Sequence, residues 1–469
     1  MSSPVQDIET QLWEECGFWK VYTGEIRRPA DSILSRVRWI ARLLMRAAVI
    51  CVRFARHPPP RKPPGSPCDL LLIYVTENQR RSVLPWIGTS QRTQTASWMA
   101  DADWNIPWLR CGFLMLRYAW PVYRTLRKRA DAPLTIPWFE EFVRFRAGLI
   151  LADELYRQSR PRVVVVSNDH SGMFRAFIRV ARHHGCKIIY TQHASIGRNL
   201  PALQFDLALL DGAQAYLHYL ESGVPTGSVV ITGRNRPQQR STRDPALPMK
   251  VGLATNFDDP IAEWVPMLRL LSRHFPEVSL RCHPAETRKL AWHWVARACG
   301  VRIESGALAD FLRDTSVLIS GMSGIILDAA LFGIPCLIKL SSLRQSVAMK
   351  DYYSYERFGL CRPIVDLESL PKLIREVTAA PADIARAAVY EAGLVVDPVA
   401  EKRAAVQMFM DCLEQGVNPA IPLSTRYTPI TCGDSSVLVP PAYAQLDKRY
   451  GWLGNVAGAH PAATAAATG

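Results

Sequence analysis

Short apolar runs alternate with longer amphipathic stretches along most of this chain. Short runs bounded by polar turns are typical of buried strands, and longer stretches with helical spacing are typical of helices. The runs predict strands at 69–75, 162–167, 187–190, 205–210, 228–232, 250–255, 278–282 and 301–304. The longer stretches predict helices near 139–158, 173–184, 261–274, 287–299, 307–313, 367–380 and 397–415. This alternation predicts an α/β fold with doubly wound parallel sheets.

Segment 317–338, VLISGMSGIILDAALFGIPCLI, carries the clearest single pattern. An apolar run ends at Ser320, a small-residue turn follows, and an apolar helix and a second run complete a βαβ unit. Ser320, Ser323 and Gly324 fall where backbone N–H groups and a helix dipole would favour a phosphate. A plain βαβ unit with Ser323 as helix N-cap fits the same residues. The segment alone leaves both interpretations open.

Proline-rich stretches divide the chain into parts. HPPPRKPPGSP at 57–67 is typical of a stiff linker, and PQQRSTRDPALP at 237–248 of a linker between domains. We predict four parts: an N-terminal basic segment at 1–66, a Rossmann-like domain at 67–236, a second one at 249–418, and an irregular, disordered tail at 419–469.

The formal net charge of +14 indicates an anionic partner, which could be a membrane surface, a nucleic acid or a phosphorylated substrate. Segment 33–56 has a helical pattern with an arginine stripe on a broadly apolar helix. Such a helix could lie in an anionic membrane interface or pack on its own domain. Because no nucleic-acid-binding motif accompanies the charge, we expect no nucleic acid partner.

The spacing of the cysteines and the hydropathy of the chain indicate its cellular compartment. The 11 cysteines are spaced singly, mostly inside apolar stretches, which is typical of reduced thiols in a cytoplasmic protein. The first residues lack the apolar core of a signal peptide, and no uninterrupted apolar span of about 20 residues predicts a membrane-crossing helix. We therefore expect a cytoplasmic protein.

Three histidines, His283, His193 and His170, follow predicted strands. His283-Pro284 follows strand 278–282, with Arg281 two residues earlier, and its imidazole could donate a hydrogen bond to an anionic oxygen. His193 follows strand 187–190, where a neutral imidazole could take a proton from a hydroxyl group. Taken alone, a histidine at either position is more often a structural one.

Asp169 and His170 follow strand 162–167 and add a carboxylate and another imidazole. Asp169 could orient one of the imidazoles or act as the base itself. Together with His193, these residues are the candidate catalytic group.

The combination of turns is more informative than any one of them. Four polar turns follow predicted parallel strands, two in each predicted domain: 167–171, 192–197, 283–284 and 320–324. Open α/β sheets bind ligands at the carboxyl ends of their strands. Two such domains predict a cleft between them for two substrates.

At this point the chain resembles a known group of proteins. IIYTQHASIG, TGRNR (232–236), SLRCHPAE (279–286) and segment 317–338 together resemble bacterial surface-polysaccharide glycosyltransferases of the GT-B fold. The nearest are the CDP-glycerol glycerophosphotransferases, the capsular Kdo transferases and the bacterial polysialyltransferases. These families have a Gln-His after a first-domain strand, then a His-Pro motif and a serine-rich loop. The resemblance covers about residues 160–340.

The resemblance implies roles for individual residues. His283 would bind the donor phosphate, Ser320 and Ser323 would hold the nucleotide phosphate, and His193 would be the base or line the acceptor site. Ser-Gly-Met-Ser replaces the adjacent serines common in relatives, and Ala194 replaces a glycine that often follows Gln-His. The families generally work without a bound metal, and no other cofactor is implied.

The resemblance also implies the reaction and its partners. A CMP-, CDP- or UDP-linked donor would pass a sugar or a polyol phosphate to a growing glycan or lipid-linked acceptor. The enzyme would work at the cytoplasmic face of the inner membrane, peripheral to its anionic surface. Two alternatives stay open: a nucleotide-sugar epimerase of similar fold, and a non-catalytic membrane-attached scaffold.

Three weaker signals complete the sequence analysis. Asp101-Ala102-Asp103 matches the Asp-x-Asp metal pattern of a different glycosyltransferase fold, but it lies in a poorly patterned segment. Asp259 is expected near a helix N-cap. In KDYYSYERFG, an aromatic-rich loop similar to one in the teichoic acid group, Arg357 could reach a diphosphate or remain solvated.

Overall fold

The architecture comes from a computed structural model of the chain. It describes residues 67–83, 92–97, 99, 102–127, 136–198, 200–234, 248–256, 259–342, 351–380, 382–391 and 397–454. The predicted basic helix at 33–56 lies outside the described residues. Within these ranges, no helix combines the length and apolar character needed to cross a bilayer.

The first sheet has nine strands in the order β14-β15-β7-β6-β5-β4-β1-β2-β3. Seven of them come from the first half of the chain and run parallel. These are β1 (Leu70–Tyr74), β2 (Thr93–Ser97), β3 (Trp104–Asn105), β4 (Val163–Val166), β5 (Lys187–Thr191), β6 (Leu207–Leu210) and β7 (Ser228–Ile231). Their central strands are buried on both faces, as near-continuous valine, isoleucine and leucine runs require.

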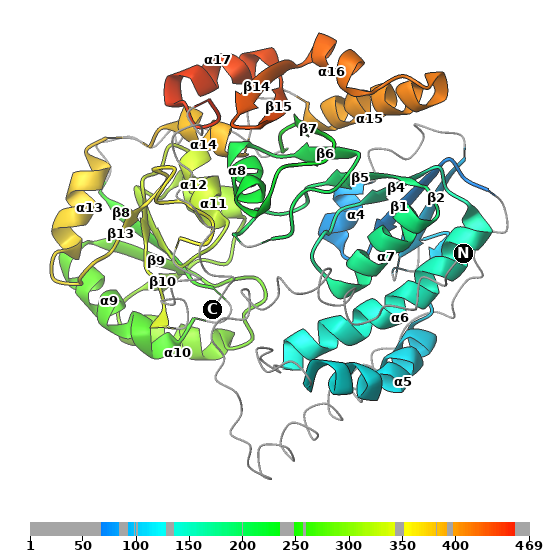
Figure 1. Cartoon of the computed structure of the whole chain (residues 1–469). Helices are drawn as coiled ribbons and strands as arrows, with labels where there is room; N and C mark the ends of the chain where they lie inside the picture. Colours follow the sequence, from blue (N-terminus) through cyan, green and yellow to red (C-terminus); the bar gives the residue numbers. More distant parts are fainter. Residues whose placement is uncertain are drawn as a thin grey trace, which may run out of the picture.

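Helices cover both faces of this sheet (Figure 1). One face packs against α6 (Ile136–Ser159) and α7 (Gly172–His183), with α5 (Trp108–Arg127) outside α6. The other face packs against α15 (Pro398–Gln415), which comes from the far end of the chain. Helices α4 (Glu77–Val83) and α8 (Ala213–Ser222) complete this half.

The second sheet is entirely parallel, with the order β10-β9-β8-β11-β12-β13. Its strands are β8 (Lys250–Ala254), β9 (Glu277–Arg281), β10 (Arg302–Ile303), β11 (Val317–Ser320), β12 (Cys336–Ile338) and β13 (Arg362–Pro363). One face of the sheet packs against three helices: α9 (Ile261–His274), α10 (Lys289–Ala298) and α13 (Leu370–Thr378). Helices α11 (Leu308–Arg313), α12 (Ile325–Leu331) and α14 (Ile384–Glu391) lie on the other side.

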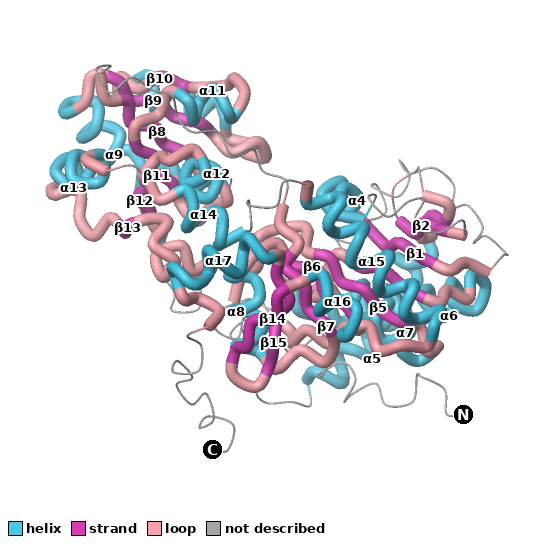
Figure 2. The backbone as a smooth tube through the Cα atoms, turned by 90° about the horizontal axis from the view of Figure 1, so that it is seen from above, coloured by secondary structure: helices cyan, strands magenta, loops and turns pink. Residues whose placement is uncertain are grey.

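The fold class expected from the sequence is confirmed. In chain order, the second sheet has the strand order 3-2-1-4-5-6 of a Rossmann fold. The seven strands β1 to β7 of the first sheet repeat this order with one further strand, β7, at the end. Both sheets carry helices on both faces, so each is a doubly wound, Rossmann-like unit. Figure 2 shows them as two separate layers of strands in one chain.

The last part of the chain corrects one expectation. Residues after 419, expected to be irregular, form α16 (Ala420–Arg426), the hairpin β14 (Thr428–Cys432) and β15 (Ser435–Val439), and α17 (Pro441–Tyr450). Because β15 pairs in parallel with β7, the hairpin extends the first sheet. These short strands are stabilised by backbone hydrogen bonds to β7 at the edge of the first sheet. The local pattern of apolar and polar residues does not show that this edge is nearby.

The two halves are joined by close packing. One buried apolar cluster includes side chains of both halves, among them Tyr216 of α8 and Tyr390 of α14. A Cβ at Gly197 would lie 1.8 Å from the Tyr352 ring, and one at Gly212 would lie 2.1 Å from the Tyr390 carbonyl oxygen. Both glycines follow strands of the first sheet, so its carboxyl edge faces the second half of the chain.

Candidate functional site

Strand order identifies where each sheet can bind a ligand. Winding reverses between β1 and β4 in the first sheet and between β8 and β11 in the second. In open α/β sheets, ligands lie outside the carboxyl ends of the strands at such a reversal. All four polar turns expected from the sequence follow parallel strands, namely β4, β5, β9 and β11. Two of these strands, β4 and β11, border the reversals themselves.

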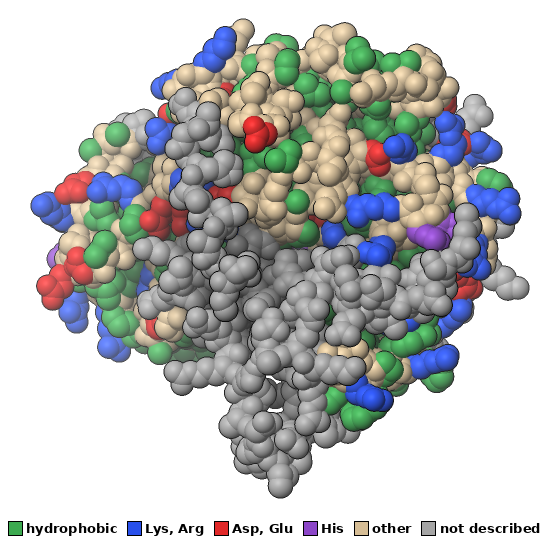
Figure 3. Space-filling model, viewed as in Figure 1, with side chains coloured by type: hydrophobic (Ala, Val, Ile, Leu, Met, Phe, Trp, Pro, Cys, Tyr) green, Lys and Arg blue, Asp and Glu red, His purple; other side chains and the backbone are tan. Residues whose placement is uncertain are grey.

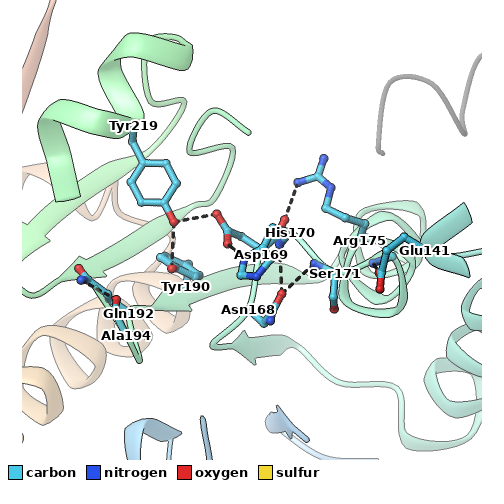
Figure 4. A network of polar contacts seen from close by, with 11 residues as sticks. Glu141, Asn168, Asp169, His170, Ser171, Arg175, Tyr190, Gln192, Ala194 and Tyr219 are labelled. Carbon is cyan, nitrogen blue, oxygen red and sulfur yellow. Dashed lines mark hydrogen bonds and ion pairs between the residues drawn. The ribbon is translucent and has the colours of Figure 1, made fainter. Parts of the chain in front are cut away.

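Asp169 is the centre of the polar network after β4 (Figure 4). Its Oδ1 lies 3.0 Å from His170 Nδ1, and its Oδ2 accepts a hydrogen bond of 2.7 Å from the Tyr219 hydroxyl. Burial raises the pKa of Asp169, but the hydrogen bonds from His170 and Tyr219 outweigh it and leave the pKa below its usual value. Asp169 is therefore an ionised acceptor for two neighbours, which suits an orienting group better than a base.

His170 is held in one orientation by this contact. With Nδ1 donating to Asp169, Nε2 is the acceptor nitrogen of the neutral ring. The backbone N–H of His170 donates to Asn168 Oδ1 at 3.1 Å, which fixes the turn. The side chain is 29% exposed, so it can meet a ligand.

His193 lies next to this pair, at the end of the neighbouring strand β5. Burial, followed by the nearby His170, lowers the pKa of His193 to about 4. Its Nδ1 is buried and makes no hydrogen bond to the described residues. His193 is thus a neutral imidazole, and the three candidate catalytic residues of the sequence lie at one place.

Gln192 has a structural role in the same turn. Its Oε1 accepts the backbone N–H of Asp211 at 2.8 Å, and its Nε2 donates to the Ala194 carbonyl oxygen at 2.9 Å. The side chain ties the end of β5 to the end of β6. The alanine that replaces the usual glycine therefore contributes a backbone acceptor to this turn.

The N-terminus of α7 is occupied by a carboxylate of the protein itself. Gly172 N–H donates to Glu141 Oε2 at 2.6 Å, where a negative charge complements the helix dipole. A Cβ at Gly172 would lie 2.0 Å from the Glu141 carbonyl oxygen, so glycine is needed for this approach. The first half therefore does not offer this helix terminus to a phosphate.

At the reversal in the second sheet, two loops are bonded to each other. Ser320 Oγ, fully buried, donates to the Ala254 carbonyl oxygen at 3.0 Å, and Asn256 Nδ2 donates to the Met322 carbonyl oxygen at 2.8 Å. Because a hydroxyl has one proton to donate, Ser320 fastens β11 to β8. The expected phosphate contact through its hydroxyl does not fit this placement.

The rest of this turn is less enclosed. Ser323 and Gly324 are half-buried, and the N-cap residue of α12 is Gly324, without a side-chain cap. Ser323 is therefore not the N-cap that the plain βαβ interpretation expected. Ser323 and Gly324 form the part of the turn that a nucleotide-activated donor could reach.

His283 has a defined tautomer. Its Nδ1 accepts the backbone N–H of Ala285 at 3.1 Å, so Nε2 carries the proton of the neutral ring. Arg281 does not point to the same place, because its guanidinium donates to the Gly306 carbonyl oxygen at 2.7 Å and lies over the Phe311 ring. Arg281 thus supports the loop before α11.

Glu286, which the sequence analysis missed, stabilises the turn that carries His283. Its carboxylate accepts hydrogen bonds from the Arg288 side chain and from the Trp292 indole N–H. The Arg288 hydrogen bonds lower the pKa of Glu286 to about 2. Arg288 also donates to the Asp259 carbonyl oxygen, so the turns after β8 and β9 are joined. The signal in the sequence that could have identified this role is a glutamate three residues after the histidine.

A charged cluster joins the first sheet to the later part of the chain. Buried Asp211, after β6, lies 3.2 Å from Lys402 Nζ of α15. Arg234, after β7, lies 3.5 Å from a carboxylate oxygen of buried Glu391, which also accepts a hydrogen bond from Ser195. Burial raises the pKa of Asp211, which Lys402 and Arg234 partly oppose. Asp211 and Arg234 follow strands, as the residues of the other polar turns do. Their partners, Lys402 and Glu391, come from distant segments and could not be inferred from the sequence pattern.

The weaker sequence signals have structural roles where they are described. Asp103 Oδ2 accepts hydrogen bonds from the backbone and hydroxyl of Thr95, at 2.8 and 2.9 Å. Arg357 remains exposed, as one of its two interpretations expected, and pairs with Glu221 at 3.0 Å on the surface. Asp259 Oδ2 accepts a hydrogen bond from a backbone N–H within its own loop, and the N-cap of α9 is Pro260. Asp101 lies outside the described residues.

Comparisons with known proteins give fold-level similarities only. No family model and no curated protein match this sequence. Among solved structures, a glycotransferase of kitacinnamycin is similar at 13% identity and a TM-score of 0.42, covering 76% of this chain and 100% of its own. Trehalose 6-phosphate synthase from Burkholderia multivorans is similar at 11% identity and a TM-score of 0.45, covering 77% and 99%.

A third similar structure is UDP-N-acetylglucosamine 2-epimerase from Rickettsia bellii, at 12% identity and a TM-score of 0.45. It covers 75% of this chain and 99% of its own. All three TM-scores are below 0.5, so the class defined here, an α/β chain with two Rossmann-like sheets, is established by its own strand order.

Proposed function

We propose that this protein is a transferase that moves a sugar, or a polyol phosphate, from a nucleotide-activated donor to a growing bacterial cell-surface glycan. The observation that carries the proposal is the pair of imidazoles with fixed tautomers, one after a strand of each sheet. His170, oriented by Asp169, presents an acceptor nitrogen, and His283 presents a donor nitrogen. The reaction needs a base for the acceptor hydroxyl and a proton donor for the leaving phosphate.

The donor would bind to the second half of the chain. His283 Nε2–H would donate to a phosphate oxygen, and the backbone at Ser323 and Gly324 would meet the nucleotide phosphate. Arg281 and Glu286 would act indirectly, by holding the neighbouring turns. A donor group fixed before the reaction stabilises charge on the leaving phosphate without reorganisation.

The acceptor would bind at the carboxyl edge of the first sheet. In sugar transfer, the acceptor oxygen attacks the anomeric carbon, and the bond from that carbon to the phosphate oxygen breaks. The hydroxyl proton passes to His170 Nε2, and the electron pair leaves with the nucleotide. Asp169 stabilises the resulting imidazolium, and neutral His193 lines the acceptor side.

The proposal includes location and partners. The resemblance favours a CMP-, CDP- or UDP-linked donor, a glycan or lipid-linked acceptor, and a reaction that needs no metal. It also favours a position at the cytoplasmic face of the inner membrane, peripheral to its anionic surface. The net charge of +14 supports an anionic partner of this kind.

A thermal-shift series with CMP, CDP and UDP tests donor binding. One nucleotide should raise the unfolding temperature, because it binds the folded chain only. His283→Ala should remove that shift, while His293→Ala, at an exposed histidine of α10, should keep it. Equal shifts in both variants would contradict the donor role of His283.

Product analysis separates the alternatives. An epimerase would convert a nucleotide sugar without any acceptor, whereas a transferase would need one. A chain that binds none of the three nucleotides at millimolar concentration would be a scaffold instead. Activity that is lost on chelation and restored by a divalent cation would contradict the metal-independent part of the proposal.

A further inference from the structure

Helix α5 exposes large apolar side chains on one face. Phe113, Leu116 and Trp120 are 65%, 59% and 64% exposed, and their spacing places them in one row along the helix. Cys111 and Val122, on the opposite face, are buried where α5 packs against the rest of the first half. The helix thus has an apolar face toward the core and a second apolar row toward the outside.

A row of arginines runs beside the exposed apolar row. Arg110, Arg117 and Arg124 are spaced by seven residues and are all exposed. At about 100° per residue, both rows fall within about a third of the helix circumference. Arg110 pairs with Glu154 of α6, and α5 itself contains no acidic residue.

Helix α5 also carries tryptophan and tyrosine, the aromatic residue types that are enriched at membrane interfaces. The rings of Trp120 and Tyr123 stack, with centroids 5.5 Å apart. Tryptophan and tyrosine favour the headgroup level of a bilayer, because one part of each ring is apolar and another polar. Figure 3 shows hydrophobic and basic side chains together over the lower right of the molecule, where Figure 1 places α5.

Helix α10 of the second half presents a similar surface. Leu290 and Trp294 are 79% and 74% exposed, and Lys289 and Arg297 are exposed on the same helix. Figure 1 places α10 and α5 along the same lower side of the molecule.

Charge decides which partner fits this face. A second copy of the chain would bring the same arginine row, and the predicted helix at 33–56 is itself rich in arginine. Both would be repelled by α5. A bilayer with anionic headgroups accepts the apolar row and neutralises the arginines at once.

We propose that α5 docks this protein on an anionic lipid surface. Phe113, Leu116 and Trp120 insert at the level where headgroups meet acyl chains, while Arg117 and Arg124 contact lipid phosphates. Helix α10 makes a second, smaller contact. This inference deepens the proposed peripheral location. Lipid binding is measured without donor or acceptor, so docking and transfer can fail independently.

Co-sedimentation of the full chain with vesicles tests the proposal. We expect binding to phosphatidylcholine vesicles that contain phosphatidylglycerol, and little binding to phosphatidylcholine alone. The triple variant Phe113→Ser/Leu116→Ser/Trp120→Ser should weaken binding by about tenfold or more, because it removes the inserted apolar area. Arg117→Gln/Arg124→Gln should reduce the preference for phosphatidylglycerol.

The matched control is Val417→Ser/Ile421→Ser, which removes exposed apolar side chains near α16, on the upper side of the molecule in Figure 1. It should bind vesicles as the unmodified chain does. Full binding by the triple variant, for example through residues 33–56 alone, would overturn the proposal. So would self-association or RNA binding that depends on the apolar row while vesicle binding is absent.

Discussion

The carboxylate of Asp169 holds the imidazole of its neighbour His170, with Oδ1 3.0 Å from Nδ1. Tyr219 occupies the other carboxylate oxygen. The pair gives the first sheet an oriented imidazole at the carboxyl end of β4, next to the reversal of strand order where open α/β sheets bind ligands.

Removing the proposed base should slow transfer strongly. His170→Ala should lower kcat by about 100-fold or more, the usual contribution of a positioned base. Asp169→Asn should lower kcat less and change its pH profile, because His170 loses its orienting charge. Tyr219→Phe is the control: it removes one Asp169 hydrogen bond and leaves His170 held, so most activity should remain. Steady-state kinetics with donor and acceptor measure all three. Normal turnover by His170→Ala would assign the base elsewhere.

Acidification should destabilise the fold through two buried histidines. Burial lowers the pKa of His193 to about 4 and that of His218 to about 3, while in the unfolded chain both bind a proton near pH 6.5. Stability should therefore be complete above about pH 6.5 and should fall as the pH drops toward 4 and then 3, because the unfolded chain takes up more protons. Urea unfolding across this range measures the slope. His193→Gln should make it shallower, and an unchanged slope would contradict the buried neutral state of His193.

The charged cluster should depend on both partners of its ion pair. Lys402→Met leaves the buried Asp211 carboxylate without its nearest cation, and should cost about 3–5 kcal/mol in the free energy of unfolding. Lys402→Met combined with Asp211→Asn should recover much of that loss, because no charge is then stranded. Denaturant unfolding of both variants measures the difference. If Lys402→Met left the free energy of unfolding unchanged, Arg234 alone would be enough to neutralise Asp211.

The contact between Gly197 and Tyr352 should tolerate no side chain. Gly197→Ala would place a methyl group inside the Tyr352 ring, and the required shift should cost about 1–3 kcal/mol. Gly306→Ala is the control, because nothing lies within 4 Å of the added Cβ there. Adding Tyr352→Ala to Gly197→Ala should restore part of the stability. Thermal unfolding reports each change, and equal effects at both glycines would contradict this packing.

The sequence by itself determined most of the elements and the position of the candidate residues. The apolar runs at 162–167 and 317–320 became β4 and β11, and the turns after them carry polar residues as expected. These features are local: an apolar run that needs burial on both faces becomes a central strand, and the turn after it must lie at the sheet edge.

Only the tertiary structure decided which of these residues is available to a ligand. Ser320 and Asp169 look like reactive groups in the sequence, yet the Ala254 carbonyl and the Tyr219 hydroxyl engage them. The hairpin that completes the first sheet and the pair of Lys402 with Asp211 also depend on distant segments. Hydrogen bonds and ion pairs are short-ranged, so their partners are set by how the chain folds back on itself, which no local pattern of apolar and polar positions records.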